Sequence, residues 1–191
     1  MLPSIRVVLW LWILIGVAVV LLLFVVLTYN KLVRLRNETQ TGWSGIDVQL
    51  QRRSDLVPNL VEAVKGYAAH ESETFDSVTK ARAAAQQASG PAQAAQADAE
   101  MAPALNRLIA VSEAYPQLRA SENFLKLQQE LADIEDKLAA ARRYYNQTVY
   151  RFNSVQQTFP TLLIARPFGF HERQFFETDQ REPVNVSFPT A

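Results

Sequence analysis

The side chains best suited to catalysis or metal binding are the two histidines, His70 and His171. A di-iron site in a helical bundle needs four carboxylates, with Glu-x-x-His pairs that project inward. Tyr67 and Phe168 stand three residues before the two histidines, so neither position completes this motif. A haem bundle would need an axial pair, for which the two histidines and Met101 are the candidates. Because each histidine lies beside a glutamate, as surface or capping histidines often do, we expect no metal and no cofactor.

Other catalytic motifs are missing from the chain. The 191 residues contain no P-loop, no GxGxxG and no GxSxG pattern. They also contain no cysteine, which excludes disulfides and thiolate chemistry. Lysine plus arginine and aspartate plus glutamate both number 19, so no net basic charge favours nucleic acid. The sequence therefore predicts a protein that is not an enzyme and that does not bind nucleic acid.

Arg53 has the most informative position of the charged residues, because it falls on an otherwise apolar helical seam. One interpretation is a site for an anionic ligand or for a partner's carboxylate. The other is an internal ion pair with Glu130, Glu135 or Asp55, or a packed side chain whose guanidinium reaches water; arginine's frequent structural pairs favour this one. Arg53 belongs to a candidate interaction or structural motif that comprises Trp43, Asp47, Arg52, Arg53, Asp55, Pro58 and Asn59.

The spacing of apolar residues is helical almost throughout the chain after the N-terminal apolar run (residues 7–27), which predicts an all-α fold. The clearest helix runs from about Ser121 to Thr158. Its seam has heptad spacing and consists of Phe124, Leu127, Leu131, Ile134, Leu138, Ala141, Tyr145, Thr148, Phe152 and Val155. An equivalent seam consists of Trp43, Ile46, Leu50, Arg53, Val57, Leu60, Val64 and Tyr67. Asn59, Asn146 and Asn153 lie in or beside these seams, where we expect hydrogen bonds across the bundle to fix the register.

Proline and glycine set the expected helix ends. Pro58 predicts a kink, or a new helix with Ser54 or Asp55 as its cap. A shorter helix is expected from about Glu71, leading into an Ala/Gln-rich tract (residues 81–104) that favours helix but offers little to pack. Residues 89–91 break this tract at a hairpin tip, and a third helix ends before Pro116. The result is an antiparallel bundle of about four long helices.

A membrane anchor is expected at the N-terminus, because the run from Val7 to Leu27 is apolar and uncharged and can cross a hydrocarbon core of roughly 30 Å. A cleaved signal has a shorter apolar stretch and small residues at its end, and a buried core helix would need apolar contact on every face. The basic residues Lys31, Arg34 and Arg36 outnumber Arg6, which favours a cytoplasmic C-terminal side.

The expected domains are a transmembrane anchor (1–28), a juxtamembrane helical extension (29–45), a bundle (46–177) and a flexible tail (178–191). In an up-and-down bundle the last helix returns toward the membrane. Its apolar continuation would then lie near the bilayer surface or, as the alternative, cap the core of the bundle. The candidate membrane-proximal aromatic residues are Phe159, Phe168, Phe170, Phe175 and Phe176.

Several ordered blocks resemble the LemA family of bacterial membrane proteins. The most specific are Ile46-Asp47-Val48-Gln49-Leu50, Asp55-Leu56-Val57-Pro58-Asn59-Leu60-Val61, Ala114-Tyr115-Pro116, Tyr145-Asn146 and Phe159-Pro160. The resemblance covers about residues 28–176; the Ala/Gln-rich tract and the tail depart from the pattern. It implies a single N-terminal membrane helix, an antiparallel bundle of long helices and a cytoplasmic C-terminal domain, and it does not imply an enzyme. We therefore expect the protein in the bacterial inner membrane. One branch of the family is associated with forming magnetosome membranes.

Two function classes follow from these observations. In the first, the protein is an anchored scaffold that associates with copies of itself at the lipid bilayer. In the second, it is an adapter or sensory bundle that binds another membrane protein, such as a protease or receptor.

Overall fold

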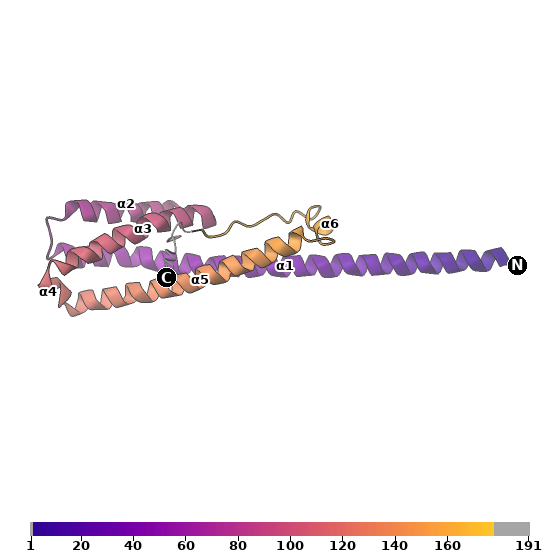
Figure 1. Ribbon diagram of the computed structural model, residues 1–191, viewed down its shortest axis with the longest axis horizontal. Helices are drawn as coiled ribbons and strands as arrows, with labels where there is room; N and C mark the ends of the chain where they lie inside the picture. Colours follow the sequence, from indigo (N-terminus) through magenta and orange to yellow (C-terminus); the bar gives the residue numbers. More distant parts are fainter. Residues whose placement is uncertain (1, 178–191) are drawn as a thin grey trace, which may run out of the picture. The chain divides into compact units, whose positions relative to one another are not determined.

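The computed structural model describes residues 2–177, and the side chains from residue 8 onward. The long helices are α1 (Leu2–Lys65), α2 (Ser72–Gln87), α3 (Gly90–Glu113) and α5 (Glu122–Gln157), and two short ones are α4 (Pro116–Arg119) and α6 (Leu162–Ala165) (Figure 1). These described residues contain no strand, so the all-α prediction is confirmed. The flexible tail expected at 178–191 lies outside them.

The chain divides into two compact units. The anchor unit comprises Met1–Gly42 and Gln147–Arg173, and the bundle unit comprises Trp43–Asn146 and Gln174–Ala191. Both α1 and α5 therefore contribute one part to each unit.

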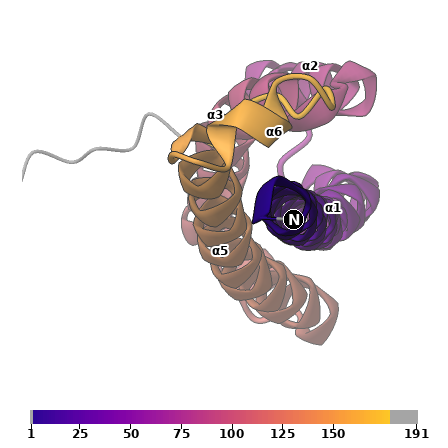
Figure 2. The ribbon, with the colours of Figure 1, turned by 90° about the vertical axis from the view of Figure 1, so that its right-hand side faces the viewer.

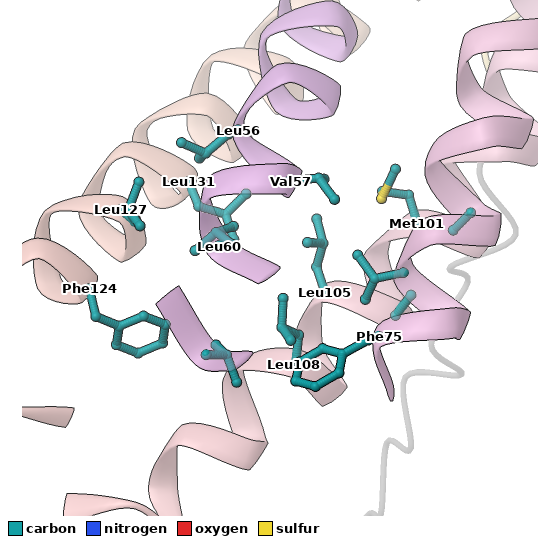
Figure 3. Packing of buried hydrophobic residues seen from close by; sticks show 14 of the residues in the cluster. Leu56, Val57, Leu60, Phe75, Met101, Leu105, Leu108, Phe124, Leu127 and Leu131 are labelled. Carbon is teal, nitrogen blue, oxygen red and sulfur yellow. The ribbon is translucent and has the colours of Figure 1, made fainter. Parts of the chain in front are cut away.

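An apolar core lies in the bundle unit, and α1, α2, α3, α4 and α5 all contribute to it (Figure 3). The expected seam of the last long helix is confirmed here, because Phe124, Leu127, Leu131 and Ile134 are all buried. They meet Leu56, Val57, Leu60 and Val64 of α1, Phe75 and Val78 of α2, and Met101, Leu105 and Leu108 of α3. Each such side chain contributes roughly 1.5–3 kcal/mol when it is fully buried, so this core holds the helices together.

The Ala/Gln-rich tract packs more closely than expected. Five of its alanines are buried, namely Ala81, Ala94, Ala95, Ala97 and Ala104. Small side chains let two helices approach closely, and α2 and α3 lie side by side along this tract (Figure 2). The prediction that the tract offers little to pack was therefore wrong. The predicted tip between the two helices is confirmed, and Gly90 there adopts a positive φ of 76°, which glycine tolerates best.

Pro58 does not end a helix. It lies inside α1, so the predicted new start at Ser54 or Asp55 was wrong. A proline lacks the N–H that would bond to the carbonyl oxygen four residues earlier, here that of Ser54. Arg82 of α2 donates to this oxygen from its Nε at 2.9 Å. The long-range hydrogen bond satisfies the carbonyl and removes one cost of proline within the helix.

The anchor unit contains the apolar part of α1. Among the described residues this is the one helix that is long and apolar enough to cross a membrane. Only 6% of its most apolar stretch is buried within the chain, whereas the core helix of a soluble protein is mostly buried. A small separate core lies beyond it, formed by Leu32, Phe152, Ala165 and Phe170. This core holds the end of α5 and the α6 turn against α1.

Candidate interaction site

The candidate motif residues of α1 lie on two different faces of the bundle unit. Trp43, Asp47 and Arg53 line a cavity of about 270 Å³ that α2 and α3 also line. Arg52, Asp55 and Asn59 line a groove of about 360 Å³ between α1 and α5. Pro58 is exposed and lines neither. The division follows from helix geometry, since residues three, four or seven apart share a face and adjacent residues do not.

A buried ion-pair network lies at the cavity. Arg53 is only 2% exposed and donates from Nη1 to Glu135 Oε1 at 2.7 Å. Its Nη2 pairs with Asp98 Oδ1, while Arg142 Nη2 pairs with Asp98 Oδ2. Asp98, which is 3% exposed, thus bridges two guanidinium groups. Burial lowers the pKa of Arg142, and the charge of Asp98 opposes this effect.

This network identifies the partners of Arg53. An internal pair was one of the two interpretations, and Glu135 was among its expected partners. Asp98 was missed because it lies in the tract that seemed not to pack. A signal was present, since Asp98 lies three residues before Met101 and seven before Leu105, on the buried face of α3. Two arginines and two carboxylates neutralise one another, so the charge of Arg53 is paired within the bundle.

The groove between α1 and α5 has a different character. Arg52, Asp55, Glu130, Asp133 and Lys137 line it, together with Leu56, Asn59 and Ile134. In the described chain none of these five charged groups forms an ion pair. Asp55 accepts from Gln51 and Asp133 accepts from Gln129, which are neighbours on their own helices. The groove therefore presents charges of both signs to solvent or to a partner.

The candidate aromatic residues are divided between core and surface. Phe170 and Phe176 are buried, as expected for residues that cap a core. Phe176 lies 6.5 Å from the Trp43 ring, and the Arg142 guanidinium lies 5.2 Å from the Phe176 ring. Phe159 and Phe168 are well exposed, and Phe175 is partly so.

The basic residues after the anchor lie on exposed positions. Lys31, Arg34 and Arg36 are all exposed, and the Arg36 guanidinium lies 5.5 Å from the Phe170 ring. The two histidines are exposed too. Among the described residues no group of three histidine or acidic side chains could hold a metal ion.

Two of the three seam asparagines bind the backbone of the C-terminal segment. Asn146 donates to the carbonyl of Phe176 at 3.0 Å and accepts from its N–H at 2.9 Å. Asn153 makes the same pair of bonds with Arg173 in the anchor unit. The prediction of hydrogen bonds across the bundle was therefore wrong for Asn146 and Asn153. The third asparagine, Asn59, lines the groove between α1 and α5.

The fold and these sites define an all-α, membrane-associated protein with a bundle built around a buried charge network. Comparison with known proteins identifies the family. The LemA family model matches residues 42–188, so the chain belongs to the LemA family. The matched range includes the Ala/Gln-rich tract.

Known relatives are 26% to 29% identical to this chain over the aligned residues. It is 27% identical over 175 residues to Magnetosome protein MamQ 1 of Paramagnetospirillum magneticum, covering 78% of this chain and 64% of that protein. It is 29% identical over 161 residues to Protein LemA of Metamycoplasma hominis, covering 82% and 72%. The chain thus spans less than two thirds of the length of the magnetosome protein. None of these names denotes an enzyme.

Proposed function

We propose that the protein is a membrane-anchored helical scaffold that associates with further copies of itself through the groove between α1 and α5. The observation that carries this proposal is the set of five charged residues in the groove, which make no ion pair within the described chain. Two of them, Arg52 and Lys137, are cationic, and three, Asp55, Glu130 and Asp133, are anionic.

A groove with both signs of charge is suited to pairing with itself. In a two-fold contact the same patch is presented by both copies, and each unlike pair of residues occurs twice. Cations of one copy would then face carboxylates of the other. Single exposed ion pairs contribute only about 0–1 kcal/mol, but anchoring in one membrane confines the copies and raises their effective concentration. The likeness to proteins named as magnetosome proteins supports a membrane-associated protein of a non-catalytic type.

The scaffold is tested by crosslinking between copies in the native membrane. Because the chain has no cysteine, Asn59→Cys provides one thiol in the groove, and Glu100→Cys provides a matched thiol at an exposed position of α3. We expect dimers with a short bismaleimide at position 59 and few at position 100. Crosslinks from position 59 to one foreign protein would favour the adapter instead.

Charge reversal tests whether the groove itself makes the contact. Arg52→Glu with Lys137→Glu gives a groove with only negative charges and should abolish the position 59 dimer by repulsion. Co-expression with a copy that carries Asp55→Lys, Glu130→Lys and Asp133→Lys should restore mixed dimers. Reversal of the exposed pair Arg107 and Arg119 is the control. If both double reversals affect crosslinking equally, the groove is not the interface.

We also propose that the anchor lies in the bacterial inner membrane with the bundle in the cytoplasm. The support is the basic cluster Lys31, Arg34 and Arg36 just after the apolar run. In intact spheroplasts a membrane-impermeant maleimide should leave Glu100→Cys unmodified until the cells are lysed. Modification before lysis would reverse the orientation.

A further inference from the structure

Three exposed apolar side chains lie in the short segment that follows α5. Phe159 is 75% exposed, Leu163 is 65% exposed and Phe168 is 54% exposed. They belong to what we call the α6 segment (residues 159–170), which contains α6 and lies in the anchor unit. Large apolar side chains grouped this way mark a surface that contacts a partner or a membrane.

The opposite side of the α6 segment is packed firmly against α1. Ala165 and Phe170 share a small core with Leu32 and Phe152. The N–H of Phe170 donates to the carbonyl of Ala165 at 3.0 Å, which closes the turn after α6. Since these residues hold the segment in place, the position of its exposed side relative to α1 is fixed within the anchor unit.

Ring contacts place the segment at the end of the apolar run. Tyr29, two residues beyond this run, lies 5.3 Å from the Phe168 ring and 5.7 Å from the Phe170 ring. Thr28 is only 8% exposed, and Val25 is half-buried although its neighbours are exposed. Residues 25, 28 and 29 share one face of α1, and the ring contacts of Tyr29 place the segment against this face just beyond the apolar run.

The charges around this point suit an anionic membrane surface. Lys31 and Arg34 on α1 and Arg166 in the α6 segment are exposed. The sequence has no acidic residue from 28 to 37 or from 158 to 171. Aromatic side chains with flanking lysine and arginine are typical of the boundary between headgroups and acyl chains.

We infer that the α6 segment is a second membrane contact, in which Phe159, Leu163 and Phe168 insert into the interface of the bilayer that α1 crosses. The contact rests on the membrane anchoring in the proposed function. It goes beyond that function, because two helices of the chain would then be fixed at one membrane surface. The helix α1 would be fixed by its membrane span, and α5 by the α6 segment that follows it. The lipid class implied is one with anionic headgroups.

The test uses the full-length, cysteine-free chain in liposomes of phosphatidylcholine and phosphatidylglycerol. A single cysteine replaces Leu163 or Phe168 and carries the environment-sensitive fluorophore NBD. Val20→Cys within the apolar run and Tyr144→Cys on an exposed part of α5 are the controls. We expect quenching by lipids brominated on the acyl chain at positions 20, 163 and 168, and no quenching at position 144.

Other outcomes separate the two proposals. If position 20 is quenched while positions 163 and 168 are quenched by aqueous iodide instead, the membrane contact is overturned and the anchor stands. If position 20 is also not quenched, the membrane anchoring itself fails. Shielding of positions 163 and 168 from both quenchers would overturn the inference in favour of a protein contact. In liposomes of phosphatidylcholine alone, we expect the brominated lipids to quench NBD emission less at positions 163 and 168.

Discussion

Arg82 of α2 donates from its Nε to the carbonyl oxygen of Ser54 at 2.9 Å. Within α1 this oxygen would accept from the N–H of residue 58, but residue 58 is a proline and has no N–H. The side chain of one helix thus completes the backbone hydrogen bonding of another. An unsatisfied buried carbonyl costs roughly 1–3 kcal/mol, which is similar to the cost of proline within a helix. The contact explains why α1 continues through a proline, and it ties α2 to α1.

Replacing Arg82 with methionine should lower the free energy of unfolding by about 1–3 kcal/mol, because the Ser54 carbonyl loses its donor. In a Pro58→Ala background the same replacement should cost less, since the N–H of the introduced alanine then bonds to Ser54. Urea unfolding of the full chain in detergent micelles, followed by circular dichroism, measures both. Arg107→Met on exposed α3 is the matched control. Equal costs of Arg82→Met in the two backgrounds would refute this explanation.

The buried network makes Asp98 the most sensitive of its four members. Removing one partner of a buried ion pair typically costs about 3–5 kcal/mol, whereas an exposed pair contributes about 0–1 kcal/mol. Asp98 is 3% exposed and holds two arginines, while Glu135 is 42% exposed. Asp98→Asn should therefore destabilise the bundle several times more than Glu135→Gln. The ratio of the two losses, from chemical unfolding, is the measurement.

A further variant checks that charge, and not volume, causes this loss. In Asp98→Leu combined with Arg53→Met and Arg142→Met, apolar side chains replace the two buried charges and the partly buried charge of Arg142. Replacing a buried ion-pair network in this way is often neutral or stabilising. The triple variant should thus be more stable than Asp98→Asn. A triple variant that is even less stable would mean that the network specifies the helix packing.

Arg142 should make no contribution to the pH dependence of stability near neutral pH. Burial lowers its pKa, so between the folded and unfolded pKa values the unfolded chain binds more protons. The free energy of unfolding therefore rises with pH in that window, which is strongly alkaline for arginine. We expect the difference between Arg142→Gln and the unaltered protein to stay constant from about pH 6 to 9. A difference that changes across this range would show that another group titrates with Arg142.

The main fold could be predicted from the sequence because burial follows helical spacing. The α5 seam from Phe124 to Phe152 shows this, since eight of its positions are buried: Phe124, Leu127, Leu131, Ile134, Leu138, Tyr145, Thr148 and Phe152. The site could be predicted only in part, because its contacts join distant residues. Pro58 looked like a helix break because the donor that compensates for it lies on another helix.

Asp98 and the asparagines show two other reasons. The carboxylate was hidden in an alanine-rich tract, whose tight packing depends on the partner helix and not on the tract's own hydrophobicity. Asn146 was expected to bind across the bundle. It instead binds backbone in an extended segment that has no helical periodicity of its own.

The two bonds of Asn146 should fix the segment around Phe176 to α5. Asn146→Asp keeps the acceptor for the Phe176 N–H but replaces the amide donor with an oxygen that repels the Phe176 carbonyl. Loss of one such bond costs about 1 kcal/mol, so the Phe176 amide should exchange with solvent roughly fivefold faster. Hydrogen exchange with mass spectrometry measures this, with Asn106→Asp on exposed α3 as the control. Phe176 is only 2% exposed, and packing against Trp43 could alone retain it. In that case exchange would stay unchanged in Asn146→Asp and would increase in Trp43→Ala, which would assign the attachment to the rings and not to the asparagine.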